Sequence, residues 1–393
     1  MARSRIGAGG RSMAAAACIA TLALVPSVAY GQWEYTNLQV PGEPFASAHG
    51  IDGGVPVGSN GEAGFWSEYT PDSFVSLQPP SLQHGSQCLG AHEGQQVGSV
   101  NYLRSFYGIY ENRASLWSGS ADTWVSLHTQ DRHGISHSTA VATHGGQQVG
   151  WTWTEPVTER AALWTGTAAS VVDLMPAGAR VSLALGVHDG VQVGSALFDE
   201  TRRAGLWRGT ADSWVDLHPA GASRSSANAA DAGIQGGEVW IDGVSHAALW
   251  RGTAESWENL GPGVIYAMHD GWQVGVEVNQ PLVWNGTAAS REPLPIPDGF
   301  DRVVTTDIWH DGQTLYVVGQ ARGTFTQAAH VWTRPMAACR ADLDGDGSLT
   351  IFDFLAFQNL FDTGDPIADF DGDGELTIFD FLAFQNAFDA GCP

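Results

Sequence analysis

Two acidic runs near the C-terminus have the residue types and the spacing of calcium-binding loops. The runs are Asp342–Asp353 and Asp369–Asp380. Each has aspartates at positions 1, 3 and 5, a glycine at position 6 and an aspartate at position 12. Ca²⁺ binds six to eight oxygen atoms, and a tight turn with carboxylates on alternate residues brings such atoms to one point. The spacing therefore predicts one Ca²⁺ ion in each loop.

The expected ligands follow from the loop positions. Side chains serve positions 1, 3, 5 and 12, a main-chain carbonyl serves position 7, and a water-mediated contact serves position 9. Two solvated acidic turns are the alternative, but two complete loops in tandem favour two bound calcium ions. The predicted ligands are Asp342, Asp344, Asp346, Ser348, Thr350 and Asp353 in the first loop and Asp369, Asp371, Asp373, Glu375, Thr377 and Asp380 in the second.

An apolar segment of nearly the same sequence follows each loop. We expect Ile351–Phe361 and Ile378–Phe388 to be helical. We expect no helix before the first loop, because Thr333–Ala341 is too short to form one and contains a proline. The loop-then-helix repeat resembles a type I dockerin, a module that docks secreted proteins onto a cohesin partner. The ending Gly391-Cys392 is similar to that of GC-type dockerin-like domains. The resemblance implies a small α-helical, calcium-dependent docking domain over residues 337–393.

The resemblance also indicates where a partner would bind. In dockerins, the residues at loop positions 10 and 11 help to select the cohesin. Here these residues are apolar, which implies an apolar contact with a cohesin-like or cell-envelope protein. The predicted partner-binding residues are Ile351, Phe352, Ile378 and Phe379.

Residues 1–31 have the composition of a secretory signal peptide. Basic residues from Arg3 to Arg11 precede the apolar run Met13–Val25, and small residues follow it. The run is too short for a transmembrane anchor, and no later stretch is long enough to cross a bilayer. We therefore expect a protein that is secreted or associated with the cell surface, without a transmembrane segment, and the resemblance to GC-type domains implies a bacterial source.

Three cysteines are left once Cys18 is removed with the signal peptide. Cys339 and Cys392 bracket the acidic loops, so in an oxidising compartment we expect a disulfide between them, worth about 3–4 kcal/mol. The alternative for Cys392 is a processing or attachment signal. We expect Cys88 to be a buried thiol.

The formal net charge of −24 bears on the class of partner. Nucleic acids are bound largely through lysine and arginine, which together number 18 against 42 acidic residues. The charge therefore makes nucleic acid an unfavourable partner.

Residues 32–336 contain an internal repeat. Short β-branched and aromatic runs, separated by glycine-rich turns, recur at intervals of about 40–50 residues, which is typical of a four-stranded propeller blade. The 49 glycines and the lack of an apolar helical period exclude a helical solenoid. The pattern predicts a mainly β, seven-bladed β-propeller. The Trp that follows an apolar residue in each repeat is Trp66, Trp117, Trp164, Trp207, Trp250, Trp284 or Trp332.

The two ends of the repeat region are predicted to form one blade together. The last repeat stops after Val331–Pro335 without a fourth strand, and Trp33–Pro41 has the pattern of that strand. Pairing them closes the ring and covers a sheet edge that would otherwise be open. Six blades is the alternative, because Arg291–Pro297 lacks the repeated Trp.

The repeat also resembles a described family. Segments such as Gly190–Gly194, with the pattern Gly-x-Gln-Val-Gly, and the segment His246–Trp250 are similar to the HAF repeat of extracellular bacterial proteins. The resemblance implies a propeller without an assigned catalytic residue.

Histidines and tryptophans recur at fixed positions of the repeat. His92, His144, His188, His269 and His310 occupy one turn position, which Asp231 takes in the fifth repeat and Ile51 in the first. We interpret these histidines as groups that bond to backbone and fix the turns, and metal ligation is the alternative. We interpret the repeated tryptophans as packing between blades, with stacking on sugars as the alternative.

The longest aromatic loop is the best candidate for ligand contact on the propeller. It lies in Val100–Arg113, and a glycan is the expected class of ligand. A lengthened hairpin that packs on itself is the alternative. The candidate residues are Tyr102, Arg104, Phe106, Tyr107 and Tyr110.

No motif for catalysis is present in the sequence. It contains no Gly-x-Ser-x-Gly elbow, His-Glu-x-x-His helix or phosphate-binding loop, so we name no catalytic residue. We expect a secreted, calcium-binding protein whose C-terminal module anchors a propeller recognition domain. The alternatives are a dockerin-borne enzyme that degrades polysaccharide and a purely structural envelope protein.

Overall fold

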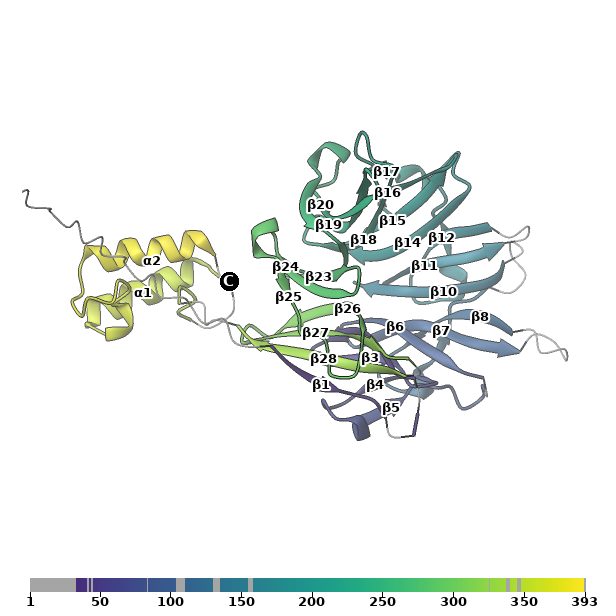
Figure 1. Cartoon of the computed structure of the whole chain (residues 1–393), viewed down its shortest axis with the longest axis horizontal. Helices are drawn as coiled ribbons and strands as arrows, with labels where there is room; N and C mark the ends of the chain where they lie inside the picture. The colour runs from purple at the N-terminus through teal and green to yellow at the C-terminus, as the bar shows by residue number, and fades with distance from the viewer. Residues whose placement is uncertain are drawn as a thin grey trace, which may run out of the picture. The chain divides into compact units, whose positions relative to one another are not determined.

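The structure is a computed structural model. It describes residues 33–40, 42–43, 45–82, 84–103, 110–129, 135–154, 158–324, 326–336, 340–344 and 348–391. The predicted signal peptide lies outside these residues. The described chain is mainly β and forms a seven-bladed propeller followed by two helices, as predicted (Figure 1).

Every blade is a four-stranded antiparallel sheet. In the first three blades the strands follow chain order. They are β2 (Ser47–Asp52), β3 (Val55–Ser59), β4 (Ala63–Trp66) and β5 (Phe74–Ser76); β6 (Ser86–His92), β7 (Gln95–Leu103), β8 (Tyr110–Trp117) and β9 (Val125–Ser126); and β10 (Ile135–His144), β11 (Gln147–Thr154), β12 (Thr158–Trp164) and β13 (Val172–Asp173).

The next three blades repeat this order. They contain β14 (Val181–His188), β15 (Val191–Phe198), β16 (Thr201–Trp207) and β17 (Val215–Asp216); β18 (Arg224–Asp231), β19 (Ile234–Ile241), β20 (Val244–Trp250) and β21 (Glu258–Pro262); and β22 (Val264–His269), β23 (Trp272–Glu277), β24 (Gln280–Asn285) and β25 (Glu292–Pro293). The sixth blade is complete although its outer strand lacks the repeated Trp, which rules out the six-bladed alternative.

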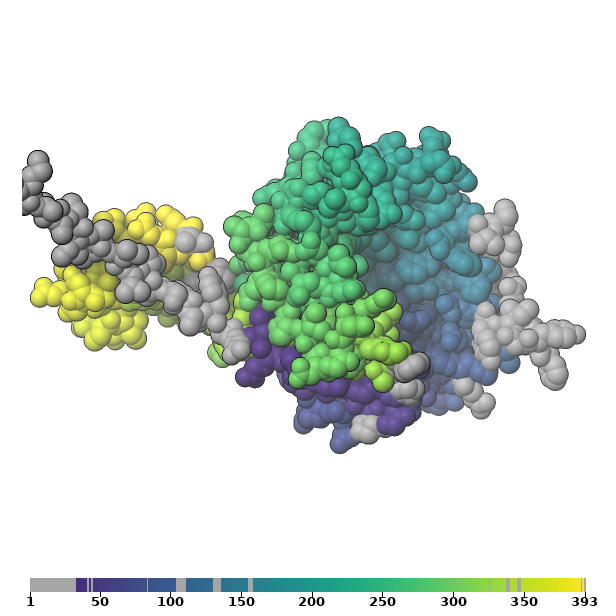
Figure 2. Space-filling view, in the orientation of Figure 1, coloured from purple at the N-terminus to yellow at the C-terminus, as the bar shows by residue number. Residues whose placement is uncertain are grey.

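The seventh blade joins both ends of the repeat region, as predicted. Its strands are β26 (Arg302–His310), β27 (Thr314–Arg322), β28 (Gln327–Pro335) and β1 (Glu34–Asn37). β1 pairs antiparallel with β28, with Tyr35 opposite Trp332 and Thr36 opposite Val331. Figure 2 shows purple N-terminal residues against green residues of the last blade. The pairing closes the ring.

The repeated tryptophans pack between blades, as predicted. Each is fully buried and lies in a different apolar cluster. Trp66 of blade 1, for example, packs with Val318 and Val331 of blade 7, and Trp250 of blade 5 packs with Val193 of blade 4. Cys88 is a free, fully buried thiol, also as predicted.

The repeated Gln of the Gly-x-Gln-Val-Gly segment links two turns of its own blade. In blade 4, Gln192 Nε2 donates to the Gly190 carbonyl at 2.8 Å, and Gln192 Oε1 accepts from the Gly209 amide at 2.7 Å. The equivalent glutamines of blades 2, 3, 5 and 6 make the same pair of bonds. The glutamine of the motif therefore fixes two turns of its own blade.

Short 3₁₀ turns precede the outer strands. A hydroxyl closes each turn; Ser213 Oγ, for instance, donates to the Thr210 carbonyl at 2.6 Å and accepts from the Arg208 amide at 2.7 Å. The turns are η1 (Pro71–Ser73), η2 (Ala121–Thr123), η3 (Ala168–Ser170), η4 (Ala211–Ser213), η5 (Ala254–Ser256) and η6 (Ala288–Ser290).

The C-terminal segment has its own small core. α1 (Ile351–Thr363) and α2 (Ile378–Ala390) pack through aromatic rings, with Phe357 and Phe384 stacked at a centroid distance of 4.4 Å. The 3₁₀ turn η7 (Pro366–Ala368) lies between the helices in sequence. Among the described residues, neither helix is long and apolar enough to cross a membrane.

The Trp packing gives the first prediction. Trp207→Ala should lower the free energy of unfolding by about 3–5 kcal/mol, because it leaves a cavity between blades 3 and 4. The matched variant Trp240→Ala, at a partly exposed Trp, should cost less. Urea unfolding followed by circular dichroism measures both. Equal losses in the two variants would contradict the packing role.

Candidate functional site

A cavity of about 700 Å³ runs along the axis of the propeller. Its wall is made by the first strand of every blade, the strand closest to the axis. Each of these strands carries a β-bulge, an extra residue with no partner on the next strand. The extra residues line the cavity. They are His49, Leu89, Val141, Leu185, Asn228, Tyr266 and Thr306.

Glycine in the second strand makes room for each bulge. A Cβ atom on Gly194 would lie 1.9 Å from the carbonyl oxygen of Leu183, just before the bulge in β14. The other six blades have a glycine in the same relation to their first strand. The last glycine of the Gly-x-Gln-Val-Gly segment therefore lets the inner strand turn a side chain toward the channel.

A ring of seven residues, six of them titratable, surrounds one mouth of the channel. Each blade contributes one residue to this ring, three positions after its bulge, at the turn into the second strand. The ring members, in blade order, are Asp52, His92, His144, His188, Asp231, His269 and Trp309.

The structure corrects the repeat position that the sequence analysis assigned in two blades. In blade 1 the ring residue is Asp52, not Ile51, because Asp52 pairs with Val55 across the turn. In blade 7 it is Trp309, and His310 lies one residue further on, because the turn there is longer and His310 pairs with Leu315. A single sequence does not show these shifts, since the bulge can be located only from the pairing of the strands.

Some residues at the channel mouth accept hydrogen bonds from backbone amides, the role predicted for the histidines, and two of these are His144 and His310. His144 Nδ1 accepts from the Asp189 amide at 3.3 Å, and Asp52 Oδ2 accepts from the Gly94 amide at 2.8 Å. Both bonds reach the turn of the next blade rather than the residue's own turn. His310 Nδ1 accepts from the Gly312 amide of its own turn at 3.2 Å. The ring thus ties neighbouring blades together at the mouth.

The histidines of blades 2, 3 and 4 lie against one another. The ring centroids of His92 and His144 are 4.2 Å apart, and those of His144 and His188 are also 4.2 Å apart. Burial, together with His188 and His92, lowers the pKa of His144 below its ordinary value. His144 is therefore an uncharged imidazole at neutral pH.

Two titratable groups line the deeper channel. Burial and the charge of Arg322 lower the pKa of His49 to about 4. Burial raises the pKa of Asp307 to about 7, although its carboxylate accepts hydrogen bonds from the Ile51 and Ile308 amides at 2.9 Å each. The channel is thus partly apolar with a few placed polar groups, as in many small-molecule sites.

The predicted ligand loop lies at the other end of its blade. His92 pairs with Gln95 at one end, and Leu103 pairs with Tyr110 at the other. The Arg113 guanidinium stacks on the Tyr102 ring at 3.3 Å, so Tyr102 packs on its own hairpin. Tyr110 begins β8. Arg104, Phe106 and Tyr107 lie outside the described residues.

In the C-terminal segment, three carboxylates converge within each of the two predicted loops. Ligand oxygens of Asp342, Asp344 and Asp353 lie within 4.8 Å of one another, as do those of Asp369, Asp371 and Asp380. These oxygens are hard donors of the kind that Ca²⁺ prefers, so the residues fit the ion. Asp346 lies outside the described residues.

Hydrogen bonds hold the last aspartate of each loop. Asp353 Oδ1 accepts from the Leu343 amide and Asp353 Oδ2 from the Thr350 amide, both at 2.8 Å. Asp380 Oδ2 accepts from the Thr377 amide at 2.7 Å, and this bond is the largest cause that lowers the pKa of Asp380. These capping bonds begin α1 and α2 and point the carboxylates back into the loops.

Like charges meet in the second loop. Desolvation, followed by the carboxylates of Asp373, Asp380 and Asp369, raises the pKa of Asp371 above its ordinary value. A cation among these groups would remove that repulsion. Asp373 Oδ1 accepts from the Glu375 amide at 2.8 Å, which shapes the turn without supplying positive charge.

The predicted partner-binding residues are exposed. Exposure is 65% for Ile351 and 62% for Phe352, against 64% for Ile378 and 62% for Phe379. Each pair begins a helix, so the two halves present the same apolar surface. Of the predicted disulfide, Cys339 and Cys392 both lie outside the described residues.

Comparison with known proteins supplies no family. No protein-family model matches the chain, and no curated protein matches it. Puromycin hydrolase is similar in structure, with 13% identity, a TM-score of 0.48, and coverage of 77% of this chain and 54% of that one. A protein of unknown function from Dyadobacter fermentans has 9% identity, a TM-score of 0.40, and coverage of 77% and 98%. The fold assignment rests on the strand pairing of the chain itself.

The buried His49 predicts a pH dependence. Its pKa in the folded protein, about 4, is below the ordinary 6.5, so its contribution to stability is present above pH 6.5 and lost as the pH falls toward 4. His49→Gln should remove this loss, about 2 kcal/mol after allowance for partial exposure. The raised pKa of Asp307 makes the folded state more stable as the pH falls, but it does so equally in the wild type and in the variant.

Urea unfolding of the wild type and of His49→Gln between pH 7.5 and 4.5 measures this effect. The difference in unfolding free energy between the two proteins should change steadily over that range. Parallel curves would show that His49 keeps its ordinary pKa in the folded protein.

Proposed function

We propose that the protein is a secreted, calcium-dependent modular protein. Its dockerin-like C-terminal module anchors the propeller to a protein partner or to the cell envelope. The observation that carries the proposal is the convergence of two carboxylate triads, each joined to an exposed apolar pair at the start of a helix. Ca²⁺ would be held by the loop carboxylates and would offset their repulsion.

The link between ion and surface is the helix start. Asp353 and Asp380 are both loop residues and capping residues of α1 and α2. Ordering of the loops therefore fixes the first helical turns, which carry Ile351-Phe352 and Ile378-Phe379. Exposed apolar side chains of this size favour contact with another protein. The propeller would then present its channel and loops as a recognition surface, with a glycan as the expected ligand class.

A polysaccharide-degrading enzyme is the second candidate. One observation favours it: burial keeps the pKa of Asp307 near 7 inside the channel, and the charge of Asp52 also raises it. A protonated carboxyl near a second carboxylate is the arrangement that glycoside hydrolysis uses. Release of reducing sugar from a polysaccharide distinguishes this candidate from a recognition domain.

Removal of one loop carboxylate tests calcium binding. The wild type should bind two Ca²⁺ ions in isothermal titration calorimetry. Asp344→Ala and Asp371→Ala should each weaken one site by roughly 100-fold, or about 2.8 kcal/mol, because each removes a charged ligand. Asp362→Ala, at an exposed acid on α1, is the charge-matched control and should keep both sites. An unchanged titration in both loop variants would refute the assignment.

The apolar pairs predict the docking surface. Phe352→Ser with Phe379→Ser should keep both Ca²⁺ ions, because the side chains are exposed, yet reduce Ca²⁺-dependent retention on a cell-envelope fraction at least tenfold. Val278→Ser, at an exposed apolar residue of the propeller, is the control. Retention that survives in chelator, or in the double variant, would contradict docking through this surface.

A further inference from the structure

Two groups of imidazole and carboxylate side chains lie at the channel mouth, and neither belongs to the calcium loops. The first is His144 with His188 and Asp189, and the second is His269 with Asp270 and His310. In each group the ligand atoms lie within 4.8 Å of one another. Both groups have the same composition, two histidines and one aspartate, and both join two adjacent blades.

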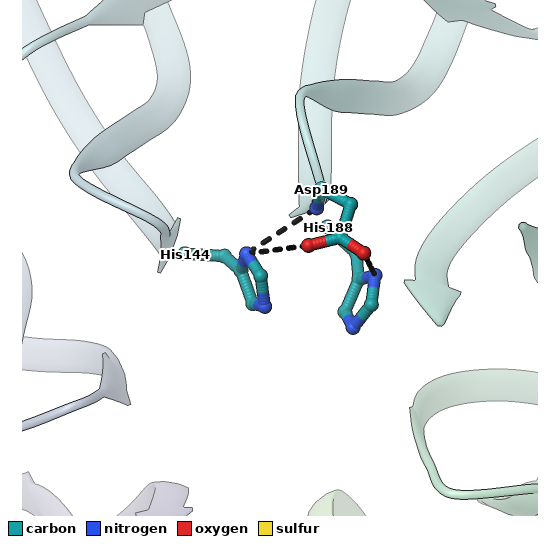
Figure 3. Close-up of side chains that lie close together, drawn as sticks. All are labelled: His144, His188 and Asp189. Carbon is teal, nitrogen blue, oxygen red and sulfur yellow. Dashed lines mark hydrogen bonds and ion pairs between the residues drawn. The ribbon is translucent and has the colours of Figure 1, made fainter. Parts of the chain in front are cut away.

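In the first group, the carboxylate lies between two imidazoles (Figure 3). Asp189 Oδ1 is 3.9 Å from His144 Nδ1, and Asp189 Oδ2 is 3.7 Å from His188 Nδ1. These distances are too long for hydrogen bonds. Ligand atoms that share one metal ion approach it to about 2.0–2.2 Å, so small side-chain movements would bring all three to it.

Unused nitrogen atoms support a ligand at this place. His188 Nδ1 and the neighbouring His92 Nε2 are buried and accept or donate no hydrogen bond among the described residues. Buried polar atoms in folded proteins normally have a partner, so these two nitrogen atoms are available to a ligand at the channel mouth.

The second group also places one carboxylate beside two imidazoles, here through a single oxygen atom. Asp270 Oδ2 is 3.6 Å from His269 Nε2 and 3.6 Å from His310 Nε2. Asp189 and Asp270 both occupy the first position of a tight turn with positive φ, 46° and 43°. The turn thus holds each carboxylate beside the histidine that precedes it.

We propose that the channel mouth binds divalent transition-metal ions of the Zn²⁺ class, one at His144, His188 and Asp189 and one at His269, Asp270 and His310. Imidazole with carboxylate suits such ions, whereas Ca²⁺ and Mg²⁺ prefer oxygen ligands alone. Three protein ligands leave a coordination position for water or for an oxygen atom of a ligand in the channel. The sites are independent of the calcium-dependent anchoring proposed above.

Zn²⁺ titration of the full chain, without a histidine tag and in millimolar Ca²⁺, tests this proposal. Calcium occupies the acidic loops, so Zn²⁺ reports the channel mouth. The expected stoichiometry is two Zn²⁺ per chain in equilibrium dialysis. His144→Ala with His188→Ala should bind one. Co²⁺ should give the visible absorption of a nitrogen- and oxygen-ligated ion, and the double variant should lose about half of it.

A milder variant guards against misfolding. Asp189→Asn keeps a residue that tolerates positive φ but removes the charge, and it should weaken one site at least tenfold. Asp199→Asn is its matched control, because Asp199 has a φ of 50° in another turn of the same blade. Absence of bound Zn²⁺, or equal Zn²⁺ binding by Asp189→Asn and Asp199→Asn, would overturn the proposal.

Discussion

The structure depends on the burial of each blade's faces against its two neighbours. A four-stranded sheet cannot bury an apolar face alone, so Trp207 packs against blade 3 and Trp250 against blade 4. In an open row of blades, the first and the last would each keep one apolar face uncovered, so the ring must close. Pairing of β1 with β28 supplies that closure, because it completes the blade on which Trp66 of blade 1 packs.

Closure also creates the channel mouth. Seven inner strands meet around one axis, and closure brings residues from distant parts of the chain together, such as Ile51 of blade 1 and Asp307 of blade 7. The C-terminal module works by a different constraint, the repulsion among carboxylates such as Asp371 and Asp373. One part is thus held by apolar packing, and the other has charges that a cation would balance.

Much of this fold could be predicted from the sequence. Trp66 and its equivalents recur at a blade-length interval, and the missing last strand identified Trp33–Pro41 as its replacement. The bulge residues of the channel could not be predicted, because His49 and Asn228 reach the cavity through irregularities that depend on strand pairing. The role of Asp52 was missed for the same reason. The repeated turns show where a residue lies within its blade. They do not show which side chain of the neighbouring blade it contacts.

Closure of the ring is the claim on which the channel mouth depends, and amide hydrogen exchange measures it directly. If β1 completes the seventh blade, the amides of Thr36 and Val331 should exchange as slowly as those of β15 and β16, because all would open only on global unfolding. Fast exchange in β1 and β28, with β14 to β17 still protected, would show an open edge and contradict the account.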